Sequence, residues 1–196
     1  MPARANPHTA FPASPPCARV EVEVAILAGG RSRRMGTDKS RLRLGRRTLL
    51  GHVREAARAT GWTVRVIRRD LKPGCGPVGG IHTALKTSQA DIVLFLACDM
   101  PLVTTELLRS MVEKIGRRAA LFCDQHGRAG FPFVLRRNCL TKVEAALIEQ
   151  SFSLQQLALR LRAGRHRPSP DHEKILTNVN TPDDWFRIRA IHRTRR

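Results

Sequence analysis

The 196-residue chain lacks several features that would define a function class at once. It has no tyrosine and only 5% aromatic residues, so no cluster of rings offers a platform on which nucleic-acid bases could stack. No apolar run approaches the roughly 20 residues that a membrane-spanning helix needs. The five cysteines form no C-x-x-C pair, and no Cys/His group has zinc-site spacing. Scattered single thiols are typical of a reduced, cytoplasmic protein.

Acidic residues are scarce. The chain has 35 Lys and Arg residues against 16 Asp and Glu residues, which gives a net charge of +19. Such a charge attracts polyanions, either nucleic acid or a phosphorylated substrate. Arginines occur along the whole chain and no base-reading aromatic cluster accompanies them, so we expect mostly nonspecific charge, with no specific nucleic-acid partner and no membrane partner.

Composition also divides the chain. Residues 1–19 are rich in Pro and Ala and contain no apolar segment of the kind found in signal peptides, so we expect a disordered leader. Residues 20–189 have the size and patterning of one domain. Residues 190–196 form a basic tail.

A strand pattern leads into the glycine-rich segment at residues 27–39. Apolar residues alternate over residues 20–26, which is typical of a strand. At Gly29 and Gly30 the backbone can turn sharply and approach a ligand, because no Cβ intervenes. The cations of the segment follow: Arg31, Arg33, Arg34 and Lys39. A glycine turn lined with cations is suited to binding a triphosphate. The Walker spacing is absent, and a plain turn with a solvated basic face is the alternative.

Strand and helix patterns alternate along the rest of the chain. Helical patterns occupy residues 49–60, 78–88, 104–115, 140–150 and 154–162, and another helix follows a cap at 181–184. Strand patterns occupy residues 64–67, 92–98, 119–123, 131–135 and 175–179. This alternation predicts an α/β fold with a mostly parallel sheet flanked by helices in a single domain.

Three loops, at residues 27–39, 70–80 and 98–101, follow strands at their carboxyl ends, where open α/β sheets bind ligands. Asp99 comes directly after the most apolar strand. A carboxylate beside a triphosphate suits Mg²⁺, which usually takes one or two carboxylates with phosphate oxygens and waters. The alternative role for Asp99 is a turn or helix cap.

Two further groups have both a binding and a structural interpretation. The glycines at residues 76–80 open a helix and expose N–H groups to a phosphate or a base edge, or form a plain turn. Asn178 and Asn180 share one face of the predicted last strand. They could hydrogen-bond a substrate, or simply end the strand before a capped helix.

Four motifs occur in a fixed order. They read L-A-G-G-x-x-x-R-M-G-x-x-K at 27–39, G-P-V-G-G-I at 76–81, C-D-M-P at 98–101 and N-V-N-T-P-D-D at 178–184. Together they resemble the molybdenum cofactor guanylyltransferases, which belong to the nucleotidyltransferase superfamily. The resemblance covers about residues 22–189 and implies a Rossmann-like fold.

The resemblance also implies a function. It implies Mg²⁺-dependent transfer of GMP from GTP to the phosphate of molybdopterin, with release of pyrophosphate, in the cytoplasm. GTP and molybdopterin would be the small-molecule partners, and a molybdoenzyme or its chaperone is a candidate protein partner. Lys39, Asp99 and Arg34 would be catalytic, and Asp99 would bind the metal. Asn178 and Asn180 would bind the acceptor substrate. The nucleotide would be bound by Leu27, Ala28, Gly29, Gly30, Lys39, Gly76, Gly79, Gly80 and Asp99.

The chain departs from the family pattern before Asp70. Family members usually have a further strand and loop between the first helix and the strand that ends there. Here only Trp62 and Thr63 separate Gly61 from Val64, so we expect one family strand to be missing. A nucleotide contact from that segment then has no matching residue.

Asp70 is a candidate for reading the base. A right-handed crossover would place the strand at residues 64–67 beside the first strand, with Asp70 facing the 27–39 loop. Its carboxylate could accept from the N–H groups of guanine. The alternative is a turn carboxylate ahead of Pro73.

Two other functions stay open at this point. One is another nucleotidyltransferase of the same fold, specific for CTP or for a sugar or alditol phosphate. The other is a non-catalytic protein that binds and delivers molybdopterin or a nucleotide. Lys39 and Asp99 argue against a purely binding role, and the G-P-V-G-G loop favours guanine through the family likeness.

Overall fold

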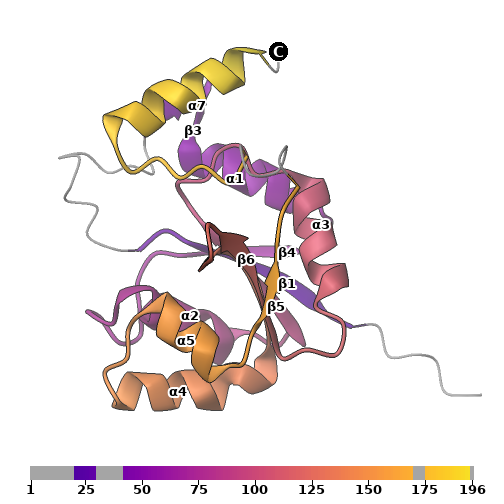
Figure 1. Ribbon diagram of the computed structural model, residues 1–196, viewed down its shortest axis with the longest axis vertical. Coiled ribbons are helices and arrows are strands. Elements are labelled where there is room, and N and C mark those ends of the chain that lie inside the picture. Colours follow the sequence, from indigo (N-terminus) through magenta and orange to yellow (C-terminus); the bar gives the residue numbers. More distant parts are fainter. Residues whose placement is uncertain (1–19, 30–41, 170–174, 195–196) are drawn as a thin grey trace, which may run out of the picture.

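The structure is a computed structural model that describes residues 20–29, 42–169 and 175–194. Figure 1 shows a central sheet with a layer of helices on each side. The predictions for Gly30, Arg34 and Lys39 lie outside the described residues, as do the leader at 1–19 and the last two residues of the basic tail.

Within the described residues, six strands form the main sheet in the order β4-β1-β5-β7-β6-β8. β1 is parallel to β4 and β5, and β8 is parallel to β6. β7 is antiparallel to both of its neighbours. The mostly parallel α/β fold is therefore confirmed, and the second long strand lies beside the first, as predicted. The strand bounds are β1 Val22–Leu27, β4 Thr63–Ile67, β5 Ile92–Ala97, β6 Ala120–Gln125, β7 Arg128–Arg136 and β8 Gly164–His166.

Helices cover both faces of the sheet (Figure 1). One layer consists of α1 Leu49–Arg58, α3 Thr105–Lys114 and α7 Pro182–Thr194. The other consists of α2 Gly76–Thr87, α4 Leu140–Ile148, which a 3-10 turn at Arg137–Cys139 precedes, and α5 Leu154–Arg160. None of these described helices combines the length and the apolar character needed to cross a bilayer.

Each helix layer has its own apolar core against the sheet. Val24 and Ile26 of β1 point into the core under α1 and α3, and the alternate residue Ala25 points into the core over α2. β5 is buried along nearly its whole length because both of its faces are covered. Each fully buried aliphatic side chain contributes roughly 1.5–3 kcal/mol of transfer free energy. The carboxyl ends of β1 and β5 are therefore rigid supports for the loops that follow.

The connection between α1 and β4 is short. α1 ends at Arg58 and β4 begins at Thr63, so residues 59–62 alone join them, and no strand is inserted there. In the strand order, β4 is an edge strand of the described sheet and lies directly beside β1.

One prediction about strands is wrong. Residues 175–179 form no strand, although Ile175, Leu176 and Val179 are buried as their apolar pattern suggests. They fill the core beside α7, and the sheet is extended instead by β8 on β6. The sequence pattern also does not predict the hairpin of β2 Arg43–Leu44 and β3 Arg47–Thr48, because each strand has only two residues.

Candidate nucleotide-binding site

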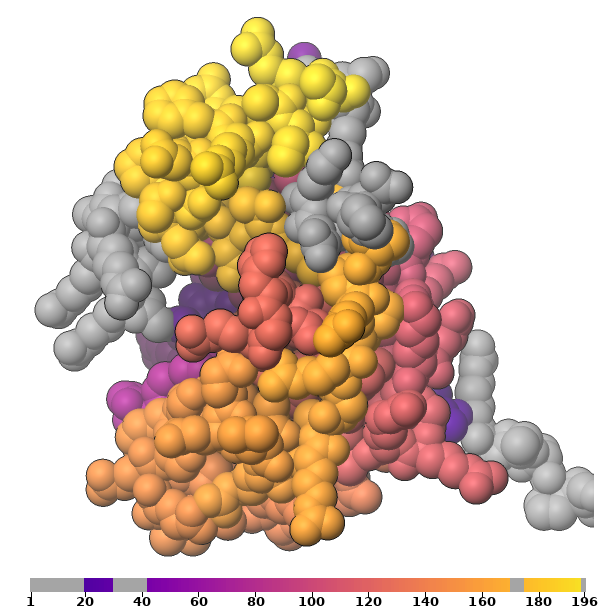
Figure 2. Space-filling view, viewed as in Figure 1, coloured from indigo at the N-terminus to yellow at the C-terminus, as the bar shows by residue number. Residues whose placement is uncertain are grey.

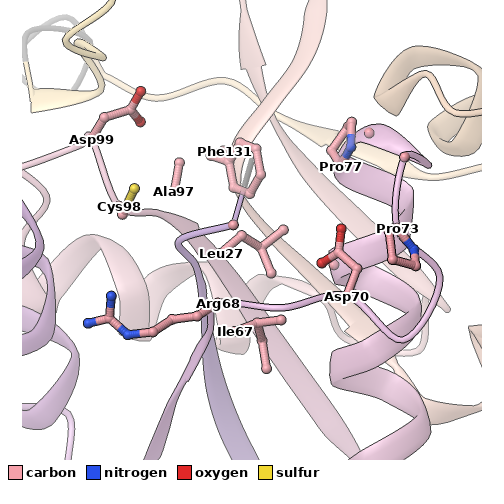
Figure 3. A pocket seen from close by; sticks show the side chains of 14 residues that line it. Leu27, Ile67, Arg68, Asp70, Pro73, Pro77, Ala97, Cys98, Asp99 and Phe131 are labelled. Carbon is pink, nitrogen blue, oxygen red and sulfur yellow. The ribbon is translucent and has the colours of Figure 1, made fainter. Parts of the chain in front are cut away.

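A cavity of about 960 Å³ opens at the carboxyl ends of β1, β4 and β5. In the space-filling view, indigo residues of β1 lie deep between the yellow α7 layer and the orange helices α4 and α5 (Figure 2). The lining includes six residues that were predicted to bind nucleotide or metal: Leu27, Gly29, Asp70, Gly76, Gly80 and Asp99. Segments far apart in the sequence thus meet at one site (Figure 3).

The start of the glycine turn is held against the end of β4. The Ala28 N–H donates to the Ile67 carbonyl at 2.8 Å. A Cβ on Gly29 would lie 3.1 Å from the Arg68 carbonyl oxygen, tighter than ordinary contacts. A side chain at position 29 would push the two loops apart, so the glycine allows the backbone of the turn to lie close to the Arg68 carbonyl.

The loop that carries Asp70 is fixed to α2. The Leu71 N–H donates to the Thr83 hydroxyl at 2.9 Å, and that hydroxyl donates to the Gly79 carbonyl at 2.9 Å. A Cβ on Gly79 would lie only 2.9 Å from Asp70 Oδ2 and 3.0 Å from the Lys72 carbonyl oxygen. Glycine at position 79 therefore allows the Asp70 carboxylate to lie directly on the first turn of α2.

The Asp70 carboxylate lacks a protein donor in the part of the chain that the structure describes. It is half buried, and this burial raises its pKa. Beside it α2 begins without a side-chain cap at Cys75, and Pro77 in its first turn has no N–H. The end of the cavity at α2 thus offers carboxylate oxygens that can accept hydrogen bonds from a ligand.

Asp99 lies on the other side of the cavity from Asp70 (Figure 3). The strand before it is tied to β1, since the Cys98 N–H donates to the Leu27 carbonyl at 3.2 Å. The Asp99 carbonyl accepts from the Val179 N–H at 3.0 Å. No group of three or more metal-ligating side chains occurs among the described residues. Asp99 fits Mg²⁺ as a single protein ligand that is completed by phosphate oxygens and waters.

Asn178 and Asn180 do not line the cavity. Because residues 175–180 form no strand, the two side chains do not share a strand face as predicted. The segment instead passes over the end of β5 through the bond from Val179 to Asp99. Asn178 Oδ1 is buried and has no hydrogen-bond partner within the described residues. Their role in substrate binding stays a prediction.

Sequence reasoning missed Arg68 and Phe131, which also line the cavity. Arg68 directly follows β4, and its position at a strand end was the available signal. Phe131 lies within β7, and the sequence gives no sign that this strand passes the cavity.

Comparison with known proteins identifies relatives over most of the chain. Residues 24–164 match the family model described as the MobA-like NTP transferase domain. The probable molybdenum cofactor guanylyltransferase of Pelotomaculum thermopropionicum is 32% identical over 191 residues, which cover 85% of this chain and 91% of that protein. The molybdenum cofactor guanylyltransferase of Syntrophotalea carbinolica is 38% identical over 188 residues, covering 84% and 89%.

Solved structures share the fold. Molybdopterin-guanine dinucleotide biosynthesis protein A from Archaeoglobus fulgidus superposes with a TM-score of 0.68 at 24% identity, over 88% of this chain and 99% of that one. CMP:2-keto-3-deoxy-manno-octonic acid synthetase, solved in complex with CTP, superposes with a TM-score of 0.64 at 15% identity, over 90% of this chain and 100% of that one. The fold is therefore common to proteins that are named for different nucleotides.

Proposed function

The chain belongs to the MobA-like NTP transferase family and is a nucleotidyltransferase, and we propose that it transfers GMP from GTP to the phosphate of molybdopterin. The observation that carries this proposal is that one cavity holds Asp70 at its α2 end and Asp99 at the other, and that Asp70 accepts no hydrogen bond from any residue that the structure describes. The first suits the N–H groups of guanine, and the second suits a metal that accompanies a triphosphate.

The reaction needs little proton chemistry. An oxygen of the acceptor phosphate forms a bond to the α-phosphorus of GTP, and the bond from that phosphorus to the pyrophosphate oxygen breaks. The nucleophile is already an anion, so no strong general base is required. Catalysis then consists of alignment and of neutralising charge on the transferred phosphorus and on the leaving pyrophosphate.

The residues divide this work along the cavity. Asp70 accepts from the guanine edge, and the glycine turn at Gly29 brings backbone close to the phosphates. Asp99 would hold Mg²⁺, which supplies charge stabilisation at the phosphates when bound. By the family pattern, Lys39 and Arg34 contact the phosphates. Through Val179, the asparagine segment is anchored at the Asp99 end, where the acceptor phosphate arrives.

Pyrophosphate release from GTP, CTP and ATP, each with and without molybdopterin, tests the proposal. We expect release only with GTP and molybdopterin together. Release with CTP and another acceptor would assign the chain to a different transferase of this fold. Tight nucleotide binding with no release from any nucleotide would favour a delivery protein.

We predict that Asp99→Ala abolishes turnover while the fold is retained. Loss of the metal ligand removes several kcal/mol of transition-state stabilisation, about a hundredfold to a thousandfold in rate. Steady-state pyrophosphate release at saturating Mg²⁺ measures the effect. Asp183→Ala is the matched control, because it removes an exposed carboxylate outside the cavity. Near-normal turnover of Asp99→Ala would remove this residue from the mechanism.

A further inference from the structure

Arg68 has no part in the function derived so far, yet it lines the same cavity as Asp70 and Asp99. Its side chain is exposed and extends away from Asp70, on the side where Cys98 and Asp99 lie (Figure 3). Its guanidinium is thus on the side of the cavity where the phosphates and the metal are expected.

The backbone at Arg68 is held firmly. The preceding residue, Ile67, accepts a 2.8 Å hydrogen bond from the Ala28 N–H, and the Arg68 carbonyl packs against Gly29. Ile67 is buried on the α2 side of the sheet, and Val66 packs on the α1 side. Because side chains alternate along a strand, Arg68 continues on the side of Val66. Because the backbone is fixed beside the glycine turn, the Cα of Arg68 has a defined position from which the long side chain extends.

Two arginines near the end of β4 are used in different ways. Arg65 is engaged by the protein itself, with bonds to Glu23, the Ala84 carbonyl and Thr87. Arg68 makes no hydrogen bond or ion pair with any part of the chain that the structure describes. Its planar set of N–H donors therefore remains available to a ligand in the cavity.

We propose that Arg68 is a phosphate-binding residue of this site. The inference rests on the proposed function in assuming that the cavity holds phosphorylated substrates. A guanidinium binds phosphate oxygens bidentately, which fixes orientation as well as supplying charge. The phosphate belongs to the triphosphate of the nucleotide or to the acceptor, and both sources share this chemistry.

The test compares Arg68→Gln with Arg69→Gln in the full chain. Arg69 is the neighbouring exposed arginine, carries the same charge and does not line the cavity. Calorimetry would measure the binding of GTP with Mg²⁺, of inorganic tripolyphosphate and of guanosine. We expect Arg68→Gln to weaken GTP and tripolyphosphate about tenfold to a hundredfold and to leave guanosine unchanged. Arg69→Gln should stay within about twofold for all three. Arg68→Lys should recover part of the lost affinity, since lysine keeps the positive charge but lacks the paired N–H donors of the guanidinium.

Measuring the KM for molybdopterin, the proposed acceptor, distinguishes the two sources of phosphate. If nucleotide binding is unchanged in Arg68→Gln but the KM for molybdopterin rises by a similar factor, Arg68 binds the acceptor phosphate. If Arg68→Gln and Arg69→Gln behave alike with every ligand, the proposal is overturned. Tripolyphosphate has no base, so it tests Arg68 even where GTP is not the substrate. Failure of GMP transfer alone would instead overturn the proposed function.

Discussion

A half-buried carboxylate without a donor beside it lowers the stability of the folded state, because burial removes water from its charged form. Asp70 is in this position: burial raises its pKa, and no described residue donates to it. A base with two neighbouring N–H groups would compensate this cost only when it is bound. This balance supports the proposal that Asp70 serves to recognise the base of the nucleotide.

We predict that Asp70→Asn raises the KM for GTP about tenfold to a hundredfold and weakens the preference over ATP. An amide offers one acceptor oxygen and places donors against the donors of guanine. ITP separates the two N–H groups, because its base lacks the exocyclic amine; the mutant should discriminate less between GTP and ITP than the natural protein does. Unchanged base preference would leave Asp70 as a turn residue, and the α2 backbone would have to read guanine.

Although Asp70→Asn should weaken GTP recognition, it should not lower the stability of the folded state. The folded-state pKa of Asp70 lies above the unfolded value, so the native state loses stability as pH rises through that interval. At neutral pH the desolvation cost is complete. Asn cannot ionise, so Asp70→Asn should unfold at an equal or higher temperature than the natural chain at pH 7, and the difference should shrink below about pH 4.

The position of a single residue was predictable where an adjacent segment of the sequence determined it. Asp99 could be placed because an almost wholly apolar strand precedes it. Arg68, Arg69 and Asp70 are consecutive charged residues, and the sequence pattern singled out Asp70 but not Arg68. The placement of both residues depends on contacts with Gly29 and Gly79, which a strand pattern does not predict.

At the scale of elements, α7 begins with a reciprocal cap. The Asp184 carboxylate accepts from the N–H groups of Asn180 and Thr181 at 3.0 and 2.9 Å, and the Asp184 N–H donates to the Thr181 hydroxyl at 3.1 Å. Burial acts to raise the pKa of Asp184, but these bonds and the charge of Arg187 hold it below its usual value. The cap also fixes the end of the segment that crosses Asp99.

We predict that Asp184→Ala lowers the free energy of unfolding by about 1 kcal/mol at neutral pH. Because the folded-state pKa is lowered, the stabilisation is present above the unfolded value of about 4 and is lost as pH falls through the folded one. Denaturant unfolding at several pH values measures this. Asp183→Ala, one residue away and exposed, is the control and should change little. A destabilisation that is equal at acidic and neutral pH would exclude the ionised cap as its cause.

Elements were predictable where local pattern and packing agree. The cap at Thr181 and the apolar run of β5 each act within a few residues. The failure at residues 175–179 has a different origin. Ile175, Leu176 and Val179 are buried there in a core between α7 and the sheet, and whether such a segment pairs as a strand depends on residues far away in the chain.

Six of the predicted binding residues lie at one rim of the molecule because β1, β4 and β5 are parallel neighbours. Their carboxyl ends lie together, so the strand pattern predicted that these residues would meet. The Lys and Arg residues behind the net charge of +19, in contrast, occur along the whole sequence. Beyond the rim, for example, Arg47, Arg54 and Arg58 line a shallow groove at α1.

We predict that the protein binds nucleic acid weakly and without sequence preference. Dispersed arginines neutralise phosphates and release counterions, so the logarithm of the association constant should fall linearly with the logarithm of salt concentration. Fluorescence anisotropy with two unrelated duplexes of equal length, from about 50 to 200 mM salt, measures both properties. The double variant Arg54→Gln and Arg58→Gln should reduce the slope slightly and equally for both duplexes, because each contact contributes only counterion release. A complex that resists salt and selects one sequence would contradict this and would identify a nucleic-acid partner with its own binding surface.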